Sequence, residues 1–399
     1  MELHDCLCPL ELSRPESLHN NPQLATLPRS PDSDTPNTSL RKCVSLLELR
    51  KTAVARNTGR AVPETEQYAV ENSLRLQVNN SLVPDRPDGT VVAEIVKTFT
   101  PFTMAAVMVV RIVAPAMMLD GDYVLKAYDR RFAIDIREEF GIEQWSPDHE
   151  MQFMKYSNDK ELNEYAADLL SNDHVRYTGK DEATNDEGSD SDNSEASADN
   201  DGLQKAYYEM LIHIACLKMY RAELEVYRRT DPLWGFDVPR FLEQIQVSNY
   251  DSSHYVEKSP TAVQGILLQY VPGFSLTELY ESKIPPIPRE LWTPVIQDAI
   301  RVTHEFGKLG IRCDDNCPRN TIVHWDPIIS AYRCMLIDFG HCQFRRPGWS
   351  DEDWGRFQAC EDEEGGIGME MQIWLQRKRG GGYVYVRSAH QDWLGQFRR

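Results

Sequence analysis

The chain has 399 residues and carries 62 Asp and Glu against 43 Lys and Arg, which gives a formal net charge of -19 at pH 7. Because nucleic acid and anionic membranes repel a protein of this charge, we expect the protein to bind neither. Hydrophobic residues make up 41% of the sequence, which is enough for a sizeable core, but no apolar run approaches the length of about 18 residues that a membrane span needs.

The nine cysteines include no pair spaced as Cys-x-x-Cys, and the N-terminus has no basic region followed by an apolar run. The sequence therefore indicates neither a disulfide framework nor a secretion signal. We expect reduced thiols and an intracellular location, either cytoplasmic or nuclear. No second ligand pair at zinc-site spacing follows Cys313 and Cys317, which favours small buried or loop cysteines over a zinc site.

The N-terminal region divides into a tail and a set of strands. Residues 1–88 are rich in Pro, Ser, Thr and Asn, a composition typical of a mostly disordered tail, and order is expected to begin after it. Two β-rich runs, residues 90–99 and 105–113, predict an antiparallel hairpin. A turn signal at Asp120-Gly121 precedes a third expected strand over residues 123–128.

The middle of the sequence alternates helical and acidic segments. Residues 147–170 have a polar helical composition. Residues 171–203 include nine acidic side chains and no Lys or Arg between Asp181 and Asp201, and such a segment cannot bury enough apolar surface to order itself. We therefore expect a disordered insert there. Apolar and aromatic residues then recur at helical spacing over residues 203–229, which predicts a long amphipathic helix.

The last third of the sequence is expected to contain a buried strand, a helix, a second hairpin and a mixture of helix and glycine-rich turns. These elements span residues 265–271, 291–309, 321–337 and 350–399, in that order. The acidic run from Glu361 to Glu364 is expected to be solvated.

The most informative motif lies before and after the second hairpin. Asp315 is followed five residues later by Asn320, and Asp338-Phe339-Gly340 comes next. Two carboxylates and a carboxamide on adjoining loops can hold Mg²⁺ on a nucleotide and receive a proton from an incoming nucleophile. Either motif alone means little, but their order, with a helix before and strands between, makes the signal stronger.

In this arrangement the sequence resembles the protein-kinase-like superfamily, with Asp315 in the catalytic-loop position and with Asn320 and Asp338 in the metal-ligand positions. The resemblance implies ATP and Mg²⁺ as cofactors, with Asp315 orienting and deprotonating an acceptor hydroxyl. It also implies an α+β fold of two lobes. An antiparallel-sheet N-lobe would span residues 89–270, including the acidic insert, and a reduced, mostly helical C-lobe would span residues 271–399.

The resemblance further implies a lysine that contacts the α- and β-phosphates and a helix glutamate that pairs with it. Lys126, at the end of the expected third strand, is in the lysine position. Glu223, which Tyr227 follows four residues later, is the preferred partner, and Glu225 is the alternative. Only one of the two can pair, because positions two apart do not share a helical face.

The adenine and phosphate contacts follow from the same resemblance. The backbone carbonyl of Gln269 and the backbone N–H of Val271 would meet the adenine edge, with Ile322 beneath the ring. The turn between the first two strands has no glycine, so the hydroxyl of Thr100 or Thr103 would have to contact the phosphates.

Three features depart from the family pattern. The first turn lacks glycine, Cys313-Asp314-Asp315 replaces His-Arg-Asp, and only 59 residues follow Gly340, without an Ala-Pro-Glu motif. The protein therefore looks closer to the compact atypical or aminoglycoside-phosphotransferase-like branches. It also resembles fungal kinase-like proteins of unassigned substrate.

The function implied is transfer of the γ-phosphoryl group of Mg–ATP to a hydroxyl acceptor, either a small molecule or a protein, which the sequence does not identify. The missing glycines and the short C-lobe leave an alternative, a pseudokinase or interaction module that keeps the fold and does not turn over. The complete set of Lys126, Asp315, Asn320 and Asp338 favours the enzyme.

Overall fold

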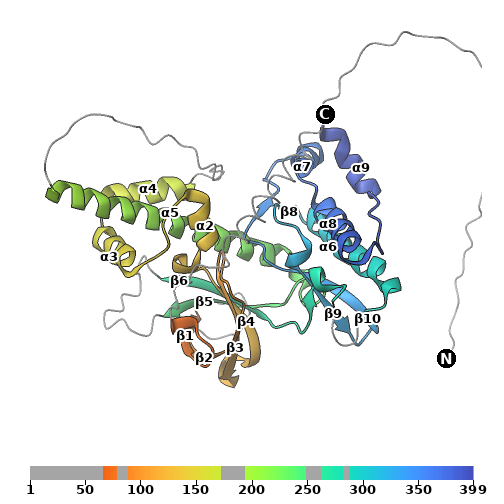
Figure 1. Ribbon diagram of the computed structural model, residues 1–399, viewed down its shortest axis with the longest axis horizontal. Helices are drawn as coiled ribbons and strands as arrows, with labels where there is room; N and C mark the ends of the chain where they lie inside the picture. Colours follow the sequence, from red (N-terminus) through yellow and green to blue (C-terminus); the bar gives the residue numbers. More distant parts are fainter. Residues whose placement is uncertain (1–65, 79–88, 172–193, 249–261, 282–286, 399) are drawn as a thin grey trace, which may run out of the picture. The chain divides into compact units, whose positions relative to one another are not determined.

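The computed structural model describes residues 66–78, 89–171, 194–248, 262–281 and 287–398, with no account of side chains in residues 194–200. All of these residues belong to one compact unit, Val62–Arg399. The unit mixes helices with antiparallel sheets (Figure 1). The expected division into two lobes near residue 270 stays a prediction, and residues 1–65 of the expected tail lie outside the described residues.

The largest sheet is a closed set of six antiparallel strands in the order β1-β2-β3-β4-β6-β5. Its strands are β1 (Ser73–Val78), β2 (Gly89–Thr98), β3 (Ala106–Ala114), β4 (Leu119–Ala127), β5 (Phe241–Ser248) and β6 (Val263–Gln269). Side chains alternate between the two faces of each strand. In β2, for example, Val91, Ala93 and Ile95 are buried while Val92 and Glu94 are exposed.

The predicted hairpin and the strand that carries Lys126 are confirmed as β2, β3 and β4, but β1 and β5 were missed. Strand β1 lies inside residues 1–88, so the expectation that order begins only after residue 88 was wrong for this strand. Its six residues stand among turn-forming residues and give a weak local signal. The strand is fixed by pairing with β2 on one side and β5 on the other, which depends on residues far away in the sequence.

A group of helices follows β4. These are η3 (Arg130–Phe132), α2 (Ile134–Phe140), α3 (Pro147–Tyr156), α4 (Lys160–Ser171) and α5 (Ser194–Arg229). The single helical region expected over residues 147–170 is divided in two. Helix α5 begins at Ser194, inside the expected insert 171–203, and residues 172–193 of that insert lie outside the described residues. Helices α3, α4 and α5 share a cluster of buried side chains that includes Phe153, Leu162 and Met210.

The remaining described residues form two small antiparallel sheets and four α-helices. The sheets are β10-β9-β7 and β11-β8. The elements are β7 (Phe274–Ser275), α6 (Trp292–Lys308), β8 (Ile311–Cys313), η7 (Pro318–Asn320), β9 (Thr321–Asp326), β10 (Ala331–Leu336), β11 (Cys342–Phe344), α7 (Asp351–Gln358), α8 (Glu363–Arg379) and α9 (Ala389–Gly395). The helix predicted over residues 291–309 and the predicted second hairpin are thereby confirmed.

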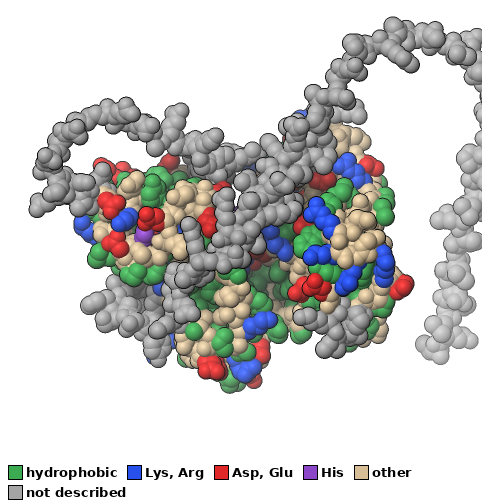
Figure 2. Space-filling model, viewed as in Figure 1, with side chains coloured by type: hydrophobic (Ala, Val, Ile, Leu, Met, Phe, Trp, Pro, Cys, Tyr) green, Lys and Arg blue, Asp and Glu red, His purple; other side chains and the backbone are tan. Residues whose placement is uncertain are grey.

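The kinds of side chain on the surface and the apolar content of the helices are both consistent with the composition of the sequence. Figure 2 shows acidic, basic and apolar side chains mixed over the face that it presents. Within the part of the protein that the structure describes, no helix is both long and apolar enough to cross a membrane. The expected solvation of the run Glu361 to Glu364 is wrong in its second half, because Glu363 is 8% exposed and Glu364 is 2% exposed.

Candidate functional site

The site centres on Lys126, which strand β4 delivers into the interior. Its side chain is 9% exposed, and its Nζ lies 2.6 Å from Glu223 Oε2 and 2.6 Å from Asp338 Oδ1. A buried ammonium group is stable only when anions pair with it. Burial by itself would lower the pKa of Lys126, but Asp338 and Glu223 outweigh it and raise that pKa. The lysine is therefore charged throughout the neutral range.

Helix α5 presents Glu223, and not Glu225, to this lysine. Glu223 is 1% exposed and also accepts a hydrogen bond from the Tyr128 hydroxyl. Glu225 instead pairs with Arg228 and Arg229 on another face of the helix, as its position two residues on requires. The two glutamates that the sequence left as alternatives thus have different surroundings.

Asp338 reaches the lysine from an unusual backbone conformation. Its φ is 66°, in the left-handed region that residues other than glycine rarely adopt. The neighbours on both sides hold it there, since the Ile337 N–H donates to the Asn320 carbonyl (2.9 Å) and the Phe339 ring is 1% exposed. The Asp338 side chain is 45% exposed. Partial desolvation disfavours its ionised carboxyl, but the charge of Lys126 outweighs this and holds the pKa of Asp338 below its ordinary value.

Phe339 is anchored by aromatic contacts from two helices. Its ring centroid lies 5.5 Å from that of Tyr227 on α5 and 5.3 Å from that of Phe306 on α6. The Tyr227 hydroxyl is itself buried and has no hydrogen-bond partner among the described residues, so this tyrosine contributes through its ring. Packing of this kind fixes Phe339, and so fixes the direction in which Asp338 points.

Asp315 and Asn320 form the second half of the site. The Asn320 amide Nδ2 donates to the Asp315 carbonyl (2.9 Å) and to its carboxylate Oδ2 (3.1 Å). The Asp315 carboxylate also faces Arg319, whose Nη2 lies 2.7 Å from Oδ2. Asp315 acts on Asp338 through its charge, which opposes ionisation of that carboxyl.

The oxygen atoms of Asn320 and Asp338 are of the type that binds a magnesium ion. Since the Asn320 amide nitrogen faces Asp315, the amide oxygen is the atom left for a metal. Lys126 occupies Oδ1 of Asp338, which leaves Oδ2 for the same purpose. No group of three His, Cys, Asp or Glu among the described residues is arranged as a complete metal cage, but Mg²⁺ commonly takes only one or two protein ligands beside phosphate oxygens and water.

The loop between β2 and β3 is anchored by the buried ring of Phe102. Phe102 is 5% exposed, and its ring centroid lies 6.2 Å from that of Tyr68 and 5.3 Å from that of Phe132. Thr103 next to it is exposed, and its carbonyl accepts the Asp135 N–H at 3.1 Å. The sequence showed that this loop has no glycine, but the burial of Phe102, which anchors the loop, was not predicted.

The expected adenine contacts lie on β6 and β9. The Gln269 side chain accepts the Arg240 N–H at 3.1 Å, and the Gln269 backbone N–H donates to the Arg240 carbonyl at 2.9 Å. Val271 is 7% exposed, and Ile322 is partly buried on β9 opposite Met335. No hydrogen bond or ion pair within the described residues joins Thr103, Gln269, Val271 or Ile322 to the lysine cluster.

Three residues of the site were not predicted from the sequence. Arg319 lies four residues after Asp315, Tyr128 lies two residues after Lys126, and Glu363 is far from both in sequence. The Cys313 N–H donates to Glu363 Oε1 at 2.7 Å, while Asn316 Nδ2 donates to the Glu363 carbonyl at 2.9 Å. Glu363 therefore holds the loop on both sides of Asp315. Burial raises its pKa to about 8.

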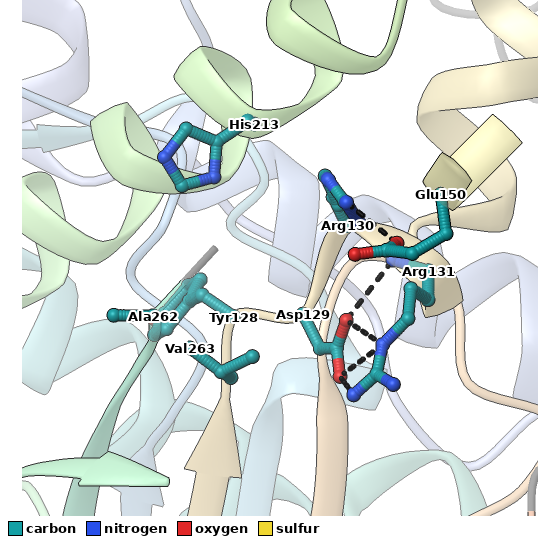
Figure 3. A pocket seen from close by; sticks show the side chains of 8 residues that line it. All are labelled: Tyr128, Asp129, Arg130, Arg131, Glu150, His213, Ala262 and Val263. Atoms are coloured by element: carbon teal, nitrogen blue, oxygen red, sulfur yellow. Dashed lines mark hydrogen bonds and ion pairs between the residues drawn. The ribbon is translucent and has the colours of Figure 1, made fainter. Parts of the chain in front are cut away.

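A second polar cluster lies next to this site, at the residues that directly follow Tyr128. Asp129 pairs with Arg131 (2.5 Å), and Arg130 pairs with Glu150 (2.6 Å) across a small pocket that His213 also lines (Figure 3). Arg130 of η3 also lies 3.6 Å from Glu209 of α5, so the cluster connects η3 with α3 and α5. Its charges are matched internally, and it presents no spare charge to a ligand.

Comparisons with known proteins give structural likenesses only. No protein-family model matches the sequence, and no curated protein matches it. Among solved structures, WaaP in complex with acyl carrier protein matches over 44% of this protein and 73% of its own length, at 15% identity and a TM-score of 0.26. The kinase domain of Mycobacterium tuberculosis PknI matches in two mutant forms.

The single mutant of PknI is 12% identical over 73% of this protein and 76% of its own length, with a TM-score of 0.31. The double mutant is 9% identical over 77% of this protein and 94% of its own length, with a TM-score of 0.30. Likenesses at these scores do not bear on the activity of this protein.

Proposed function

We propose that the protein is a kinase-like phosphotransferase that binds Mg–ATP and transfers its γ-phosphoryl group to a hydroxyl acceptor. The observation that carries the proposal is the buried lysine that contacts both Glu223 and Asp338 at 2.6 Å. Such a lysine is costly to bury and must be held by packing from several elements. The pair of Asp315 and Asn320 adds the residue types that phosphoryl transfer uses.

Each side chain would have a separate task. Lys126, held by Glu223, offers a fixed positive charge to the α- and β-phosphates, and Asn320 and Asp338 offer oxygen ligands to Mg²⁺. Bound Mg²⁺ supplies neutralisation of phosphate charge. Asp315 orients the acceptor hydroxyl and accepts its proton, after Arg319 has moved from the carboxylate. Catalysis of this kind is mostly positioning and electrostatics.

The fine contacts to the nucleotide belong to the same proposal. Gln269 and Val271 would meet the adenine edge through their backbone groups, and Ile322 would lie beneath the ring. Thr103 is exposed and would offer its hydroxyl to the phosphates. The acceptor is a small molecule or a protein.

Two observations favour a second candidate, a binding module of the same fold that does not turn over. The carboxylate assigned as proton acceptor, Asp315, is already paired with Arg319. The loop that would cover the phosphates is anchored by Phe102. ATP turnover by wild-type protein and by Asp315→Asn separates the two candidates, since a large loss in the variant supports the enzyme and equal rates support the binding module.

Nucleotide binding itself is tested by thermal unfolding. Mg–ATP should stabilise the wild-type protein by about 1.4–2.7 kcal/mol at a tenfold to hundredfold excess over its Kd. Asp338→Asn and Lys126→Met should remove most of that gain, because they remove a metal ligand and the phosphate-facing charge. Asp326→Asn, a change on the β9–β10 hairpin, is the matched control and should keep it. Absence of any shift in wild type at millimolar Mg–ATP would overturn the proposal.

A further inference from the structure

Two thiols face each other across the short ladder of β8 and β11. Cys313 and Cys342 are directly paired in antiparallel register, and their Sγ atoms lie 2.7 Å apart. Directly opposed residues of an antiparallel pair have Cβ atoms about 4.5–5.5 Å apart, and a disulfide needs about 3.5–4.5 Å. The strand pairing therefore presents the two sulfurs to each other at a separation that a bond closes with little backbone movement.

The other described cysteines have no such partner. Of the six that the structure describes, the Sγ atoms of Cys317, Cys334 and Cys360 each contact oxygen, namely the Asp315 carboxylate, the Val295 carbonyl and the Arg356 carbonyl. Only Cys313 and Cys342 have another sulfur as the contacting atom. Their pairing is thus a specific feature of this ladder within the described residues.

The position of Cys313 and Cys342 determines which residues a bond between them would enclose. The two cysteines are 29 residues apart in sequence, and the segment between them contains Asp315, Asn320 and Asp338. The Cys313 N–H is also held by Glu363, so one end of the ladder is tied to helix α8. A covalent link at this point would close a loop around every residue that we assign to the acceptor and metal chemistry.

We propose that Cys313 and Cys342 are a peroxide-oxidisable dithiol, and that oxidation joins their sulfurs in a disulfide that closes the loop carrying the proposed catalytic and metal-binding residues. Bond formation does not depend on the proposed function. Only its consequence, a fixed position of Asp315 relative to Asp338 during nucleotide binding, rests on that function.

The chemistry balances with hydrogen peroxide as the oxidant. The Cys313 thiolate attacks one peroxide oxygen, the O–O bond breaks, and Cys313 becomes a sulfenic acid while hydroxide leaves and takes up the thiol proton as water. The Cys342 sulfur then attacks the Cys313 sulfur, the S–O bond breaks, and a second water leaves. Two thiols and one peroxide thus give one disulfide and two waters, with two electrons passing from sulfur to oxygen.

Cys313 is the better first nucleophile of the two. Burial raises the pKa of both thiols, and the contact between the two sulfurs acts to lower the pKa of Cys313 and to raise that of Cys342. At 8% and 7% exposure the two residues are shielded from a bulky oxidant, so the test needs a small one. Hydrogen peroxide is therefore the probe to use.

The test is peptide mapping of the full-length protein after treatment with hydrogen peroxide and alkylation of the remaining thiols. We expect one linked pair of peptides containing Cys313 and Cys342, lighter than the two thiol peptides by two hydrogens and separated by dithiothreitol. Cys360→Ser, which removes an exposed thiol, should leave the link intact. Cys342→Ser and Cys313→Ser should each abolish it.

The consequence for stability is read from the same samples. The linked protein should unfold several degrees higher than the reduced protein, because the bond constrains the unfolded state, and dithiothreitol should reverse the shift. Cys342→Ser should show no such shift. Recovery of both cysteines in alkylated form, or linkage of either one to a different cysteine, would overturn the proposal whether or not the protein binds Mg–ATP.

Discussion

At the residue scale, the site is defined by one buried cation and the anions that stabilise it. Lys126 is joined to Glu223 and Asp338, which lie 97 and 212 residues away in sequence. Removing one member of a buried ion pair leaves the other uncompensated and usually costs about 3–5 kcal/mol. Exposed pairs contribute only about 0–1 kcal/mol. The two glutamates of α5 allow both cases to be measured on a single helix.

Glu223→Gln should lower the free energy of unfolding by about 3 kcal/mol, because it leaves the buried Lys126 with one anion in place of two. Glu225→Gln, which breaks only the pairs with Arg228 and Arg229, should cost less than about 1 kcal/mol. Urea unfolding of both variants and the wild type provides the comparison. Equal losses in the two variants would contradict the assignment of Glu223 as the buried partner.

Glu363 gives a prediction about pH. Its pKa is raised by burial to about 8 from an ordinary value of 4.5, so the folded protein holds a proton that the unfolded protein releases between these two values. The stability that this proton provides is fully present below about pH 4.5 and is lost as the pH rises toward 8. The loss should reach about 1.4 kcal/mol per pH unit at most.

Glu363→Gln should remove that part of the pH dependence, since a carboxamide does not titrate and can still accept the Cys313 N–H. Glu361→Gln, at an exposed position of the same acidic run, should leave most of it in place, because the charge of Glu361 contributes less than burial to the raised pKa of Glu363. The measurement is urea unfolding of the three proteins at several pH values between about 5 and 8. A wild-type slope equal to that of Glu363→Gln would show that Glu363 does not titrate as expected.

At the element scale, the loop between β2 and β3 and the helix α5 are the parts that tertiary packing shapes most. Phe102 packs against both Tyr68 and Phe132 and so turns the loop into the protein. Helix α5 presents Glu223 inward because Tyr227, one turn later on the same face, packs against Phe339 and Phe241. Both elements place site residues through an aromatic neighbour.

Phe102→Ala should destabilise the protein by about 3 kcal/mol, because it removes a buried ring from the contact with Tyr68 and Phe132. Phe99→Ala is the matched control, since Phe99 lies just before the same loop and is 41% exposed. Its loss should stay below about 1 kcal/mol. Urea unfolding distinguishes the two, and a loss for Phe102→Ala no larger than that of the control would mean that the ring does not anchor the loop.

At the scale of the whole molecule, the six-stranded sheet closes only because β1 pairs with both β2 and β5. Leu74, Leu76 and Val78 of β1 are at most 3% exposed. A shortened protein that begins at residue 66 keeps this strand, whereas one that begins at residue 89 leaves one edge of β2 and one edge of β5 unpaired and uncovers the core beneath them. Unpaired strand edges with apolar faces favour aggregation.

We expect the protein shortened to residues 66–399 to unfold cooperatively near the midpoint of the full-length protein, and the protein shortened to residues 89–399 to unfold at least about 10 °C lower or to aggregate. Calorimetry and light scattering measure both outcomes. Equal midpoints for the two shortened proteins would show that closure by β1 adds nothing to stability.

Local elements and the residue types of the site could be predicted from the amino-acid sequence alone. Alternation in residues 90–99 and helical spacing in residues 291–309 result from backbone geometry over a few residues, so a short window reveals them. The spacing of Asp315 and Asn320 is local in the same way. These features were predicted correctly as elements, while the roles of their residues stay proposals.

Which side chains meet is a property of the folded molecule. The choice of Glu223 over Glu225 depends on the rotation of α5 against β4, and the left-handed conformation of Asp338 depends on how Phe339 is anchored. The pairing of β1 and the facing of Cys313 and Cys342 depend on strand register between distant segments. Contacts of this range are set by packing of the whole molecule, for which a short stretch of sequence carries no signal.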